Sequence, residues 1–156
     1  MTEIRKPFPC CYWLPDGRLI AGQYPGSSDP EDARERIAAL LDAGVRTFIN
    51  LTEEHEPLEP YEELLNEEAS ARDIEVEHIR ISIGDANTPG PGVMETILDK
   101  IRETQQANRI PYVHCWGGIG RTGTVVACHL MDQGHSADEA LELVQAFFET
   151  YGRNWP

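Results

Sequence analysis

Apolar runs and amphipathic segments alternate along the chain. Short runs rich in apolar residues predict strands at 12–14, 19–22, 45–51, 74–83 and 110–113. The first two runs are joined by a Pro-Asp-Gly turn signal and predict a hairpin. Between the others, apolar residues recur every three or four positions, which is the period of an amphipathic helix. Strands that alternate with helices indicate an α/β domain with a central, mainly parallel sheet flanked by helices.

Capping residues mark where the helices begin. Asp29, followed by a proline, has the pattern of an N-cap, and Pro60 is expected to open the second helix. A segment rich in helix breakers, 84–92, leads into the third helix. Ser136 and Glu139 have the spacing of a capping box and predict the start of the last helix. The apolar residues expected to face the core are Ile37, Leu40 and Leu41 in the first helix, Leu64, Leu65 and Ala69 in the second, Val93, Ile97 and Ile101 in the third, and Leu141, Val144, Phe148 and Tyr151 in the last.

The last predicted strand runs into a glycine-rich loop and then into a predicted helix at 122–131, which Gly134 is expected to close. Backbone N–H groups of such a loop and the dipole of the following helix point at one place, which makes an anion site. The glycines allow the backbone to approach a bound group closely. The sequence therefore predicts a phosphate site lined by Trp116, Gly117, Gly118, Ile119, Gly120 and Arg121.

A cysteine and an arginine stand at the two ends of this loop. The five residues between Cys115 and Arg121 are enough for the backbone to curl once around a tetrahedral phosphate, so both side chains face the same centre. Arg121 can donate two parallel hydrogen bonds to phosphate oxygens, and the loop dipoles favour the nucleophilic thiolate of Cys115. Thr122 can donate its hydroxyl to the sulfur, and His114 is expected to orient the loop. The alternative is a buried structural cysteine beside an unrelated arginine.

These residues resemble the signature of the Cys-dependent protein tyrosine phosphatase superfamily, which is His-Cys, five residues, Arg, and then Ser or Thr. Trp116 followed by two glycines is similar to the loop of the kinase-associated dual-specificity phosphatases, and 21–26 is similar to the opening segment of dual-specificity phosphatases. The resemblance implies a small dual-specificity-phosphatase-like fold. It also implies hydrolysis of phosphotyrosine, with phosphoserine and phosphothreonine as further candidates, through a phosphocysteine intermediate and without a cofactor or metal.

The resemblance further implies a general acid on a loop some thirty residues before the cysteine. In this sequence that loop is 83–90, and Asp85 is its only acidic residue. Asp85, with Pro89 four residues later, is similar to the kinase-associated subgroup. It would protonate the leaving oxygen and then act as general base for the attacking water. The alternative is an aspartate that caps a turn.

Charge and composition exclude several classes of partner. The chain has 156 residues and a formal net charge of −14, from 27 acidic and 13 basic residues. This balance argues against nucleic acid or an anionic membrane as a binding partner, because both bind to positively charged protein surfaces. The length fits a single domain over 1–156, and the cysteines show no Cys-x-x-Cys spacing. We expect a reduced, cytoplasmic, monomeric protein, with no metal pattern among its histidines and cysteines.

Three questions stay open. The segment 53–77 holds eleven acidic residues and one basic residue, and either forms a solvated helix face or selects phosphosites flanked by Lys or Arg. The loop between Cys115 and Arg121 has no lysine, which disfavours substrates bearing several phosphates but leaves a non-protein phosphate ester, or a catalytically silent phospho-residue binder, as alternatives. The remaining cysteines are either core residues or disulfide partners for Cys115, and these are Cys10, Cys11 and Cys128.

Overall fold

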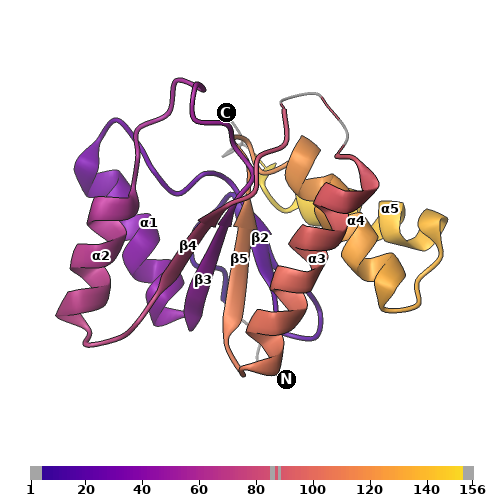
Figure 1. Cartoon of the computed structure of the whole chain (residues 1–156), viewed down its shortest axis with the longest axis horizontal. Coiled ribbons are helices and arrows are strands. Elements are labelled where there is room, and N and C mark those ends of the chain that lie inside the picture. The colour runs from indigo at the N-terminus through magenta and orange to yellow at the C-terminus, as the bar shows by residue number, and fades with distance from the viewer. Residues whose placement is uncertain (1–4, 85–86, 88, 153–156) are drawn as a thin grey trace.

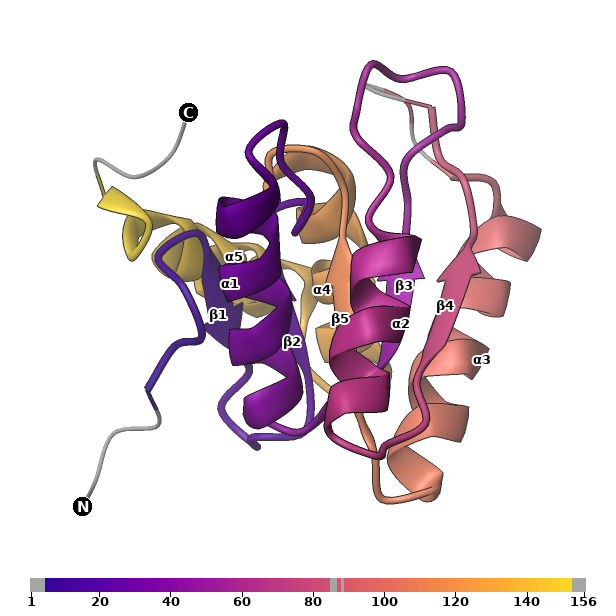
Figure 2. The same cartoon turned by 90° about the vertical axis from the view of Figure 1, so that its left-hand side faces the viewer.

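The computed structural model describes residues 5–84, 87 and 89–152 and has the predicted α/β architecture (Figure 1). Its strands are β1 (Cys11–Trp13), β2 (Ile20–Gly22), β3 (Val45–Asn50), β4 (Glu77–Arg80) and β5 (Ile110–His114). Its helices are α1 (Pro30–Asp42), α2 (Glu62–Ala71), α3 (Pro91–Gln106), α4 (Gly120–Asp132) and α5 (Ala137–Glu149). Figure 2 shows α1 and α2 covering one face of the sheet, with α3, α4 and α5 on the other.

The sheet has the strand order β1-β2-β5-β3-β4. Among the strands that the structure describes, β1 alone runs antiparallel to its neighbour, in the predicted hairpin with β2, and the other pairs are parallel. His114, the last residue of β5, lies opposite both Gly22 on β2 and Asn50 on β3. The carboxyl ends of three neighbouring strands therefore meet at one edge of the sheet, which is where open α/β sheets bind ligands.

The sheet separates two apolar clusters. On the side of α1 and α2, Ile37, Leu41, Phe48 and Tyr61 belong to one buried cluster. On the side of α3, α4 and α5, Ile49, Ile101 and Val125 belong to the other, which also contains Cys115. β3 and β5 contribute residues to both clusters because successive side chains of a strand point to opposite faces. The cysteine that follows β5 is thus held in a close-packed layer.

The capping signals predict most helix ends correctly. The Asp29 carboxylate accepts a hydrogen bond from the Glu31 N–H, and Ser136 and Glu139 form the reciprocal capping box. Gly134 has a φ of 107°, as its position after α4 predicts. The start expected at Pro60 was wrong, because α2 begins at Glu62 with Tyr61 as its N-cap residue.

Two other boundaries and two helix faces also differ from expectation. β4 covers only part of the predicted strand 74–83, although its backbone pairing continues beyond the strand, where the Ile81 and Ile83 N–H groups bond to the carbonyls of Asn50 and Leu51. α4 begins at Gly120 rather than Thr122, so Arg121 lies in its first turn. Val93 and Leu141 are exposed. Burial in α3 begins one turn after Val93, and α5 packs on α4 through the face that carries Ala140 and Val144.

None of the four cysteines forms a disulfide in the described part of the chain. Cys10 and Cys11 are buried in the two apolar clusters, and Cys128 is half-buried on α4. These positions support the interpretation of all three as packing residues. Within the part of the chain that the structure describes, none of the helices combines the length and the apolar character that crossing a membrane requires.

Candidate active site

The glycine-rich loop is held at three points by neighbouring segments. The His114 carbonyl accepts a hydrogen bond from the Leu51 N–H at 2.9 Å, and the Trp116 carbonyl accepts one from the Tyr24 N–H at 3.0 Å. The Tyr151 hydroxyl donates to the Gly118 carbonyl at 2.9 Å. These contacts use backbone carbonyls, so the carbonyl side of the loop is turned toward the protein. The arrangement favours N–H groups that face the opposite side, as an anion-binding loop requires.

The glycines of the loop are not equivalent. Gly118 has a φ of 78°, and a Cβ there would lie 2.4 Å from the carbonyl carbon of Gly22. A side chain at this position is therefore excluded both by backbone conformation and by contact with β2. Gly120, in contrast, has nothing within 4 Å of an added Cβ. The fold itself therefore requires glycine at position 118, while Gly120 has open space at the first turn of α4.

Cys115 and Thr122 are both buried beside this loop. Cys115 directly follows β5, and Thr122 lies on the first turn of α4. The Thr122 hydroxyl makes no hydrogen bond to any residue that the structure describes. The expected hydrogen bond from this hydroxyl to the Cys115 sulfur is therefore not formed. The hydroxyl is nevertheless buried beside the loop, and its proton is not donated to any described residue.

Arg121 is held by a carboxylate that the sequence did not single out. Its Nη1 and Nη2 donate to the two carboxylate oxygens of Glu56, each at 2.8 Å, and Nη1 also donates to the Ile83 carbonyl at 2.9 Å. The two side chains are only 3% and 7% exposed. The hydrogen bonds from Arg121 hold the pKa of Glu56 below its usual value, although burial opposes this effect. One edge of the planar guanidinium is therefore fixed by a buried, bidentate ion pair.

Glu56 was missed because it is one of eleven acids in a segment interpreted as a solvated face or a substrate-selecting surface. Glu56 lies instead in the loop that follows β3. This loop is at the same end of the sheet as the carboxyl end of β5 (Figure 1). Its neighbour Glu54 does match the solvated interpretation, with a side chain that is 88% exposed. The sequence offered one signal for Glu56. It follows a predicted strand, and the carboxyl ends of parallel strands are where ligands bind.

His114 is buried and connects the loop to the protein interior. Its Nδ1 lies 3.2 Å from the Cys115 carbonyl oxygen, and its Nε2 lies 2.6 Å from the Tyr61 hydroxyl. Burial lowers the pKa of His114 to about 3. The imidazole is therefore neutral near pH 7. These contacts support the prediction that His114 orients the loop rather than exchanging protons with substrate.

This buried histidine predicts a loss of stability in acid. Its pKa in the fold is below the 6.5 of an unburied histidine, so unfolding takes up a proton below pH 6.5. The stabilisation from His114 is complete above pH 6.5 and is lost as the pH falls towards 3. We expect it to add a slope of up to about 1.4 kcal/mol per pH unit to the free energy of unfolding between pH 6 and 4.

Urea unfolding at several pH values tests this slope. His114→Asn should reduce it, whereas His55→Asn should leave it unchanged because the His55 side chain is 78% exposed. His78 and His129, whose pKa values are also lowered by burial, will keep part of the slope in both variants. Equal slopes in the His114 and His55 variants would contradict the assignment.

The remaining predicted residues are placed as follows. Asp85, the expected general acid, lies outside the described residues. The Trp116 side chain is exposed. Ile119 is the N-cap residue of α4, and its carbonyl accepts the Gly123 N–H. Among the described residues, no three His, Cys, Asp or Glu side chains are grouped so that they could hold a metal ion.

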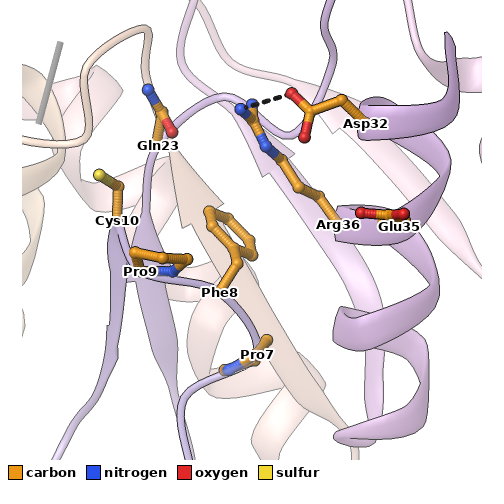
Figure 3. Close-up of a pocket in the computed structure, with 8 residues that line it drawn as sticks. All are labelled: Pro7, Phe8, Pro9, Cys10, Gln23, Asp32, Glu35 and Arg36. Atoms are coloured by element: carbon orange, nitrogen blue, oxygen red, sulfur yellow. Dashed lines mark hydrogen bonds and ion pairs between the residues drawn. The ribbon is translucent and has the colours of Figure 1, made fainter. Parts of the chain in front are cut away.

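A separate pocket of about 360 Å³ opens between α1 and the segment that precedes β1. Figure 3 shows Phe8, Cys10, Gln23 and Arg36 among the residues that line it, with Arg36 paired to Asp32. The backbone of Gln23 also lies close to the glycine-rich loop, because a Cβ added at position 118 would be 2.5 Å from the Gln23 nitrogen. None of the predicted phosphate-binding residues lines this pocket, so it is distinct from the cysteine loop.

Comparison with known proteins agrees with this geometry. A family model described as "PTP-SAK: Swiss Army Knife protein, DSP-PTPase phosphatase domain" matches residues 8–153. The chain is 43% identical over 47 residues to effector protein hopD2 of Pseudomonas syringae pv. tomato, and 36% identical over 55 residues to human dual specificity protein phosphatase CDC14A. These matches cover 30% and 35% of this chain and only 10% and 9% of the two relatives.

The fold is also found in a solved structure. The active form of Tk-PTP superposes with a TM-score of 0.68 at 25% identity, over 85% of this chain and 80% of that one. The family model covers nearly the whole chain, and the strand, loop and helix that carry the cysteine signature lie within the matched residues. The chain therefore belongs to the DSP-PTPase family, as a small dual-specificity-phosphatase-like member of the Cys-dependent protein tyrosine phosphatase superfamily.

Proposed function

We propose that this phosphatase hydrolyses phosphotyrosine in proteins or peptides through a phosphocysteine intermediate, with phosphoserine and phosphothreonine as further candidate substrates. The observation that carries the proposal is the arrangement at the end of β5. Cys115 follows the strand directly, the loop turns at Gly118, and Arg121 returns on the first turn of α4 with its guanidinium clamped by Glu56. This arrangement brings a nucleophile and a phosphate-binding cation to the two ends of one loop.

In the first chemical step the Cys115 thiolate attacks phosphorus. An S–P bond forms while the bond from phosphorus to the leaving oxygen breaks, and Asp85 protonates that oxygen. The N–H groups of residues 116–120 and the second edge of the Arg121 guanidinium, formed by Nε and Nη2, hold the equatorial phosphate oxygens. In the second step Asp85 takes a proton from water, the water oxygen bonds to phosphorus, and the S–P bond breaks to release phosphate and the thiolate.

Thr122 has a role in that second step. Its hydroxyl is buried and makes no hydrogen bond within the described part of the chain. A buried donor without an acceptor costs free energy, which is recovered when an acceptor forms beside it. We assign that acceptor to the Cys115 sulfur as negative charge returns to it, so that Thr122 stabilises the departing thiolate.

The composition of the loop supports a monophosphorylated substrate. Between Cys115 and Arg121 there are no charged side chains that could meet additional phosphates. The name of the human relative, a dual specificity protein phosphatase, supports a protein substrate as well.

We place the activity in a monomeric, cytoplasmic protein whose residues 1–156 form one domain and which uses neither metal nor cofactor.

A matched substrate panel tests this proposal. Peptides of one sequence carrying phosphotyrosine or phosphothreonine, together with an inositol polyphosphate and a generic aryl phosphate, are incubated with the wild-type protein, and phosphate release is measured. Acid quenching during turnover should trap phosphate on the peptide that contains Cys115. Release from the inositol compound but from neither peptide would replace the protein substrate with a non-protein ester. Binding of phosphopeptides without release from any substrate would indicate a silent binder.

A further inference from the structure

Trp116 directly follows the predicted nucleophile, and the fold does not account for its side chain. Trp116 is 42% exposed, and among the described residues no other aromatic side chain is exposed. Within the same part of the chain its indole takes part in no hydrogen bond, aromatic contact or cation–π contact. Trp13 differs, because its Nε1 donates to the Arg5 carbonyl and its ring packs against a buried cluster. Packing thus explains a tryptophan at position 13 but not at position 116.

Trp116 carries the one exposed side chain of the loop 116–120. Three of these five residues are glycines, and the half-buried Ile119 packs against the apolar cluster that contains Cys115. The Trp116 carbonyl is turned toward the protein, where it accepts the N–H of the buried Tyr24 at 3.0 Å. The backbone of residue 116 is therefore fixed. Its exposed indole lies at the edge of the loop, beside the segment that follows β2.

In the proposed reaction the leaving group lies on the solvent side of this loop. The Cys115 sulfur attacks phosphorus from the protein side, since Cys115 is only 3% exposed. The leaving oxygen lies opposite the attacking sulfur in an in-line displacement, so the group bonded to that oxygen points away from the protein. Adjacent Cα atoms are about 3.8 Å apart, so the indole is attached one residue away from the nucleophile. The exposed ring therefore borders the space that the leaving group occupies.

The candidate substrates differ in the group that they place in this space. In phosphotyrosine the ester oxygen is bonded directly to an aromatic ring. In phosphoserine and phosphothreonine it is bonded to an aliphatic carbon next to the peptide backbone. Two aromatic rings in offset or edge-to-face contact attract each other by more than their burial of apolar area explains. An indole beside the leaving group therefore stabilises a bound aryl phosphate more than a bound alkyl phosphate.

We propose that Trp116 is a specificity-determining residue, whose indole contacts the aromatic ring of phosphotyrosine and makes the site prefer aryl phosphates to alkyl phosphates. The inference rests on the proposed function, which leaves phosphotyrosine, phosphoserine and phosphothreonine as candidate substrates. At the other end of the loop, nothing lies within 4 Å of a Cβ added to Gly120. The aryl group therefore meets one aromatic wall rather than an enclosing pocket, and the expected preference is about tenfold rather than absolute.

Trp116→Ala tests the proposal with phosphotyrosine and phosphothreonine peptides of one sequence and with phenyl phosphate. We expect kcat/KM for the phosphotyrosine peptide and for phenyl phosphate to fall by about tenfold, and kcat/KM for the phosphothreonine peptide to stay within about threefold of the wild-type value. Trp116→Phe keeps an aromatic ring and should retain most of the preference. The matched control is Met131→Ala, because Met131 is 40% exposed but lies at the far end of α4, and it should change none of these values.

Binding to protein that lacks the nucleophile separates this role from catalysis. In the Cys115→Ser background, Trp116→Ala should weaken the affinity for the phosphotyrosine peptide, measured by calorimetry, by about tenfold. The affinity for inorganic phosphate should stay unchanged, because phosphate has no aryl group and is bound by the loop and Arg121 alone. Phosphotyrosine should also change the tryptophan fluorescence, and Trp116→Phe should remove this signal while the peptide still binds.

Two results would overturn the proposal. Equal losses for the phosphotyrosine and phosphothreonine peptides would show a general disturbance of the loop, and a loss for the phosphotyrosine peptide but not for phenyl phosphate would mean that Trp116 contacts the peptide rather than the aryl ring. If the wild-type protein released phosphate from no substrate, the proposed function would fail, while the contact with the aryl ring would still be measured by binding. If the wild type were active and Trp116→Ala kept its preference, only the role of Trp116 would fail.

Discussion

Cys115→Ser is expected to abolish phosphate release, lowering kcat for an aryl phosphate by at least about ten-thousandfold. A serine hydroxyl stays protonated at neutral pH, and His114 cannot serve as its base because it is bonded to the Cys115 carbonyl and to Tyr61. The loop N–H groups and Arg121 remain in place. Affinity for a phosphotyrosine peptide, measured by calorimetry, should therefore stay within about threefold of the wild-type value.

Cys128→Ser provides the control for this substitution. Cys128 lies half-buried on α4 and outside the loop, so its replacement should leave turnover unchanged. The folded state of both variants can be compared by circular dichroism and urea unfolding. Substantial turnover by folded Cys115→Ser protein would contradict the covalent mechanism and would point to direct attack by water.

Glu56→Gln is expected to lower kcat/KM by about a hundredfold, the second largest effect. The amide keeps the shape of the carboxylate but can accept on one side only, and its NH₂ group would face a guanidinium that also donates. Arg121 would lose the bidentate contact that sets its plane, together with the negative charge of the Glu56 carboxylate beside its buried guanidinium. We expect a higher KM together with a lower kcat, since phosphate contacts strengthen toward the transition state.

Glu54→Gln is the matched control, because it removes the same charge two residues away from an exposed position. It should change kcat/KM by less than about threefold. The sign of the effect distinguishes two roles for Glu56. If Glu56 orients Arg121, activity falls as described. If its carboxylate instead competes with phosphate for the guanidinium, Glu56→Gln will lower KM, which would contradict the positioning role.

Local sequence patterns were sufficient wherever neighbouring residues in the chain decide the structure. The capping box at Ser136 and Glu139 forms as predicted, because all of its hydrogen bonds are made within one turn. The hairpin of β1 and β2 follows from a turn signal between two apolar runs. The faces of α3 and α5 were predicted less well, and Val93 and Leu141 are exposed. Periodicity gives the direction of an apolar face but not how far the neighbouring elements extend over it.

By itself, the sequence determined the α/β class, the family and the loop that carries Cys115 and Arg121. These three features follow from residue types at fixed, short spacings. A strand, a tight turn and the start of a helix require such spacings whatever the rest of the fold. Only the tertiary structure decided which side chains hold that loop. Glu56 and Tyr61 lie 65 and 53 residues from their partners Arg121 and His114. Parallel pairing of β3 with β5 brings them together, because it places the segment after one strand beside the segment after the other.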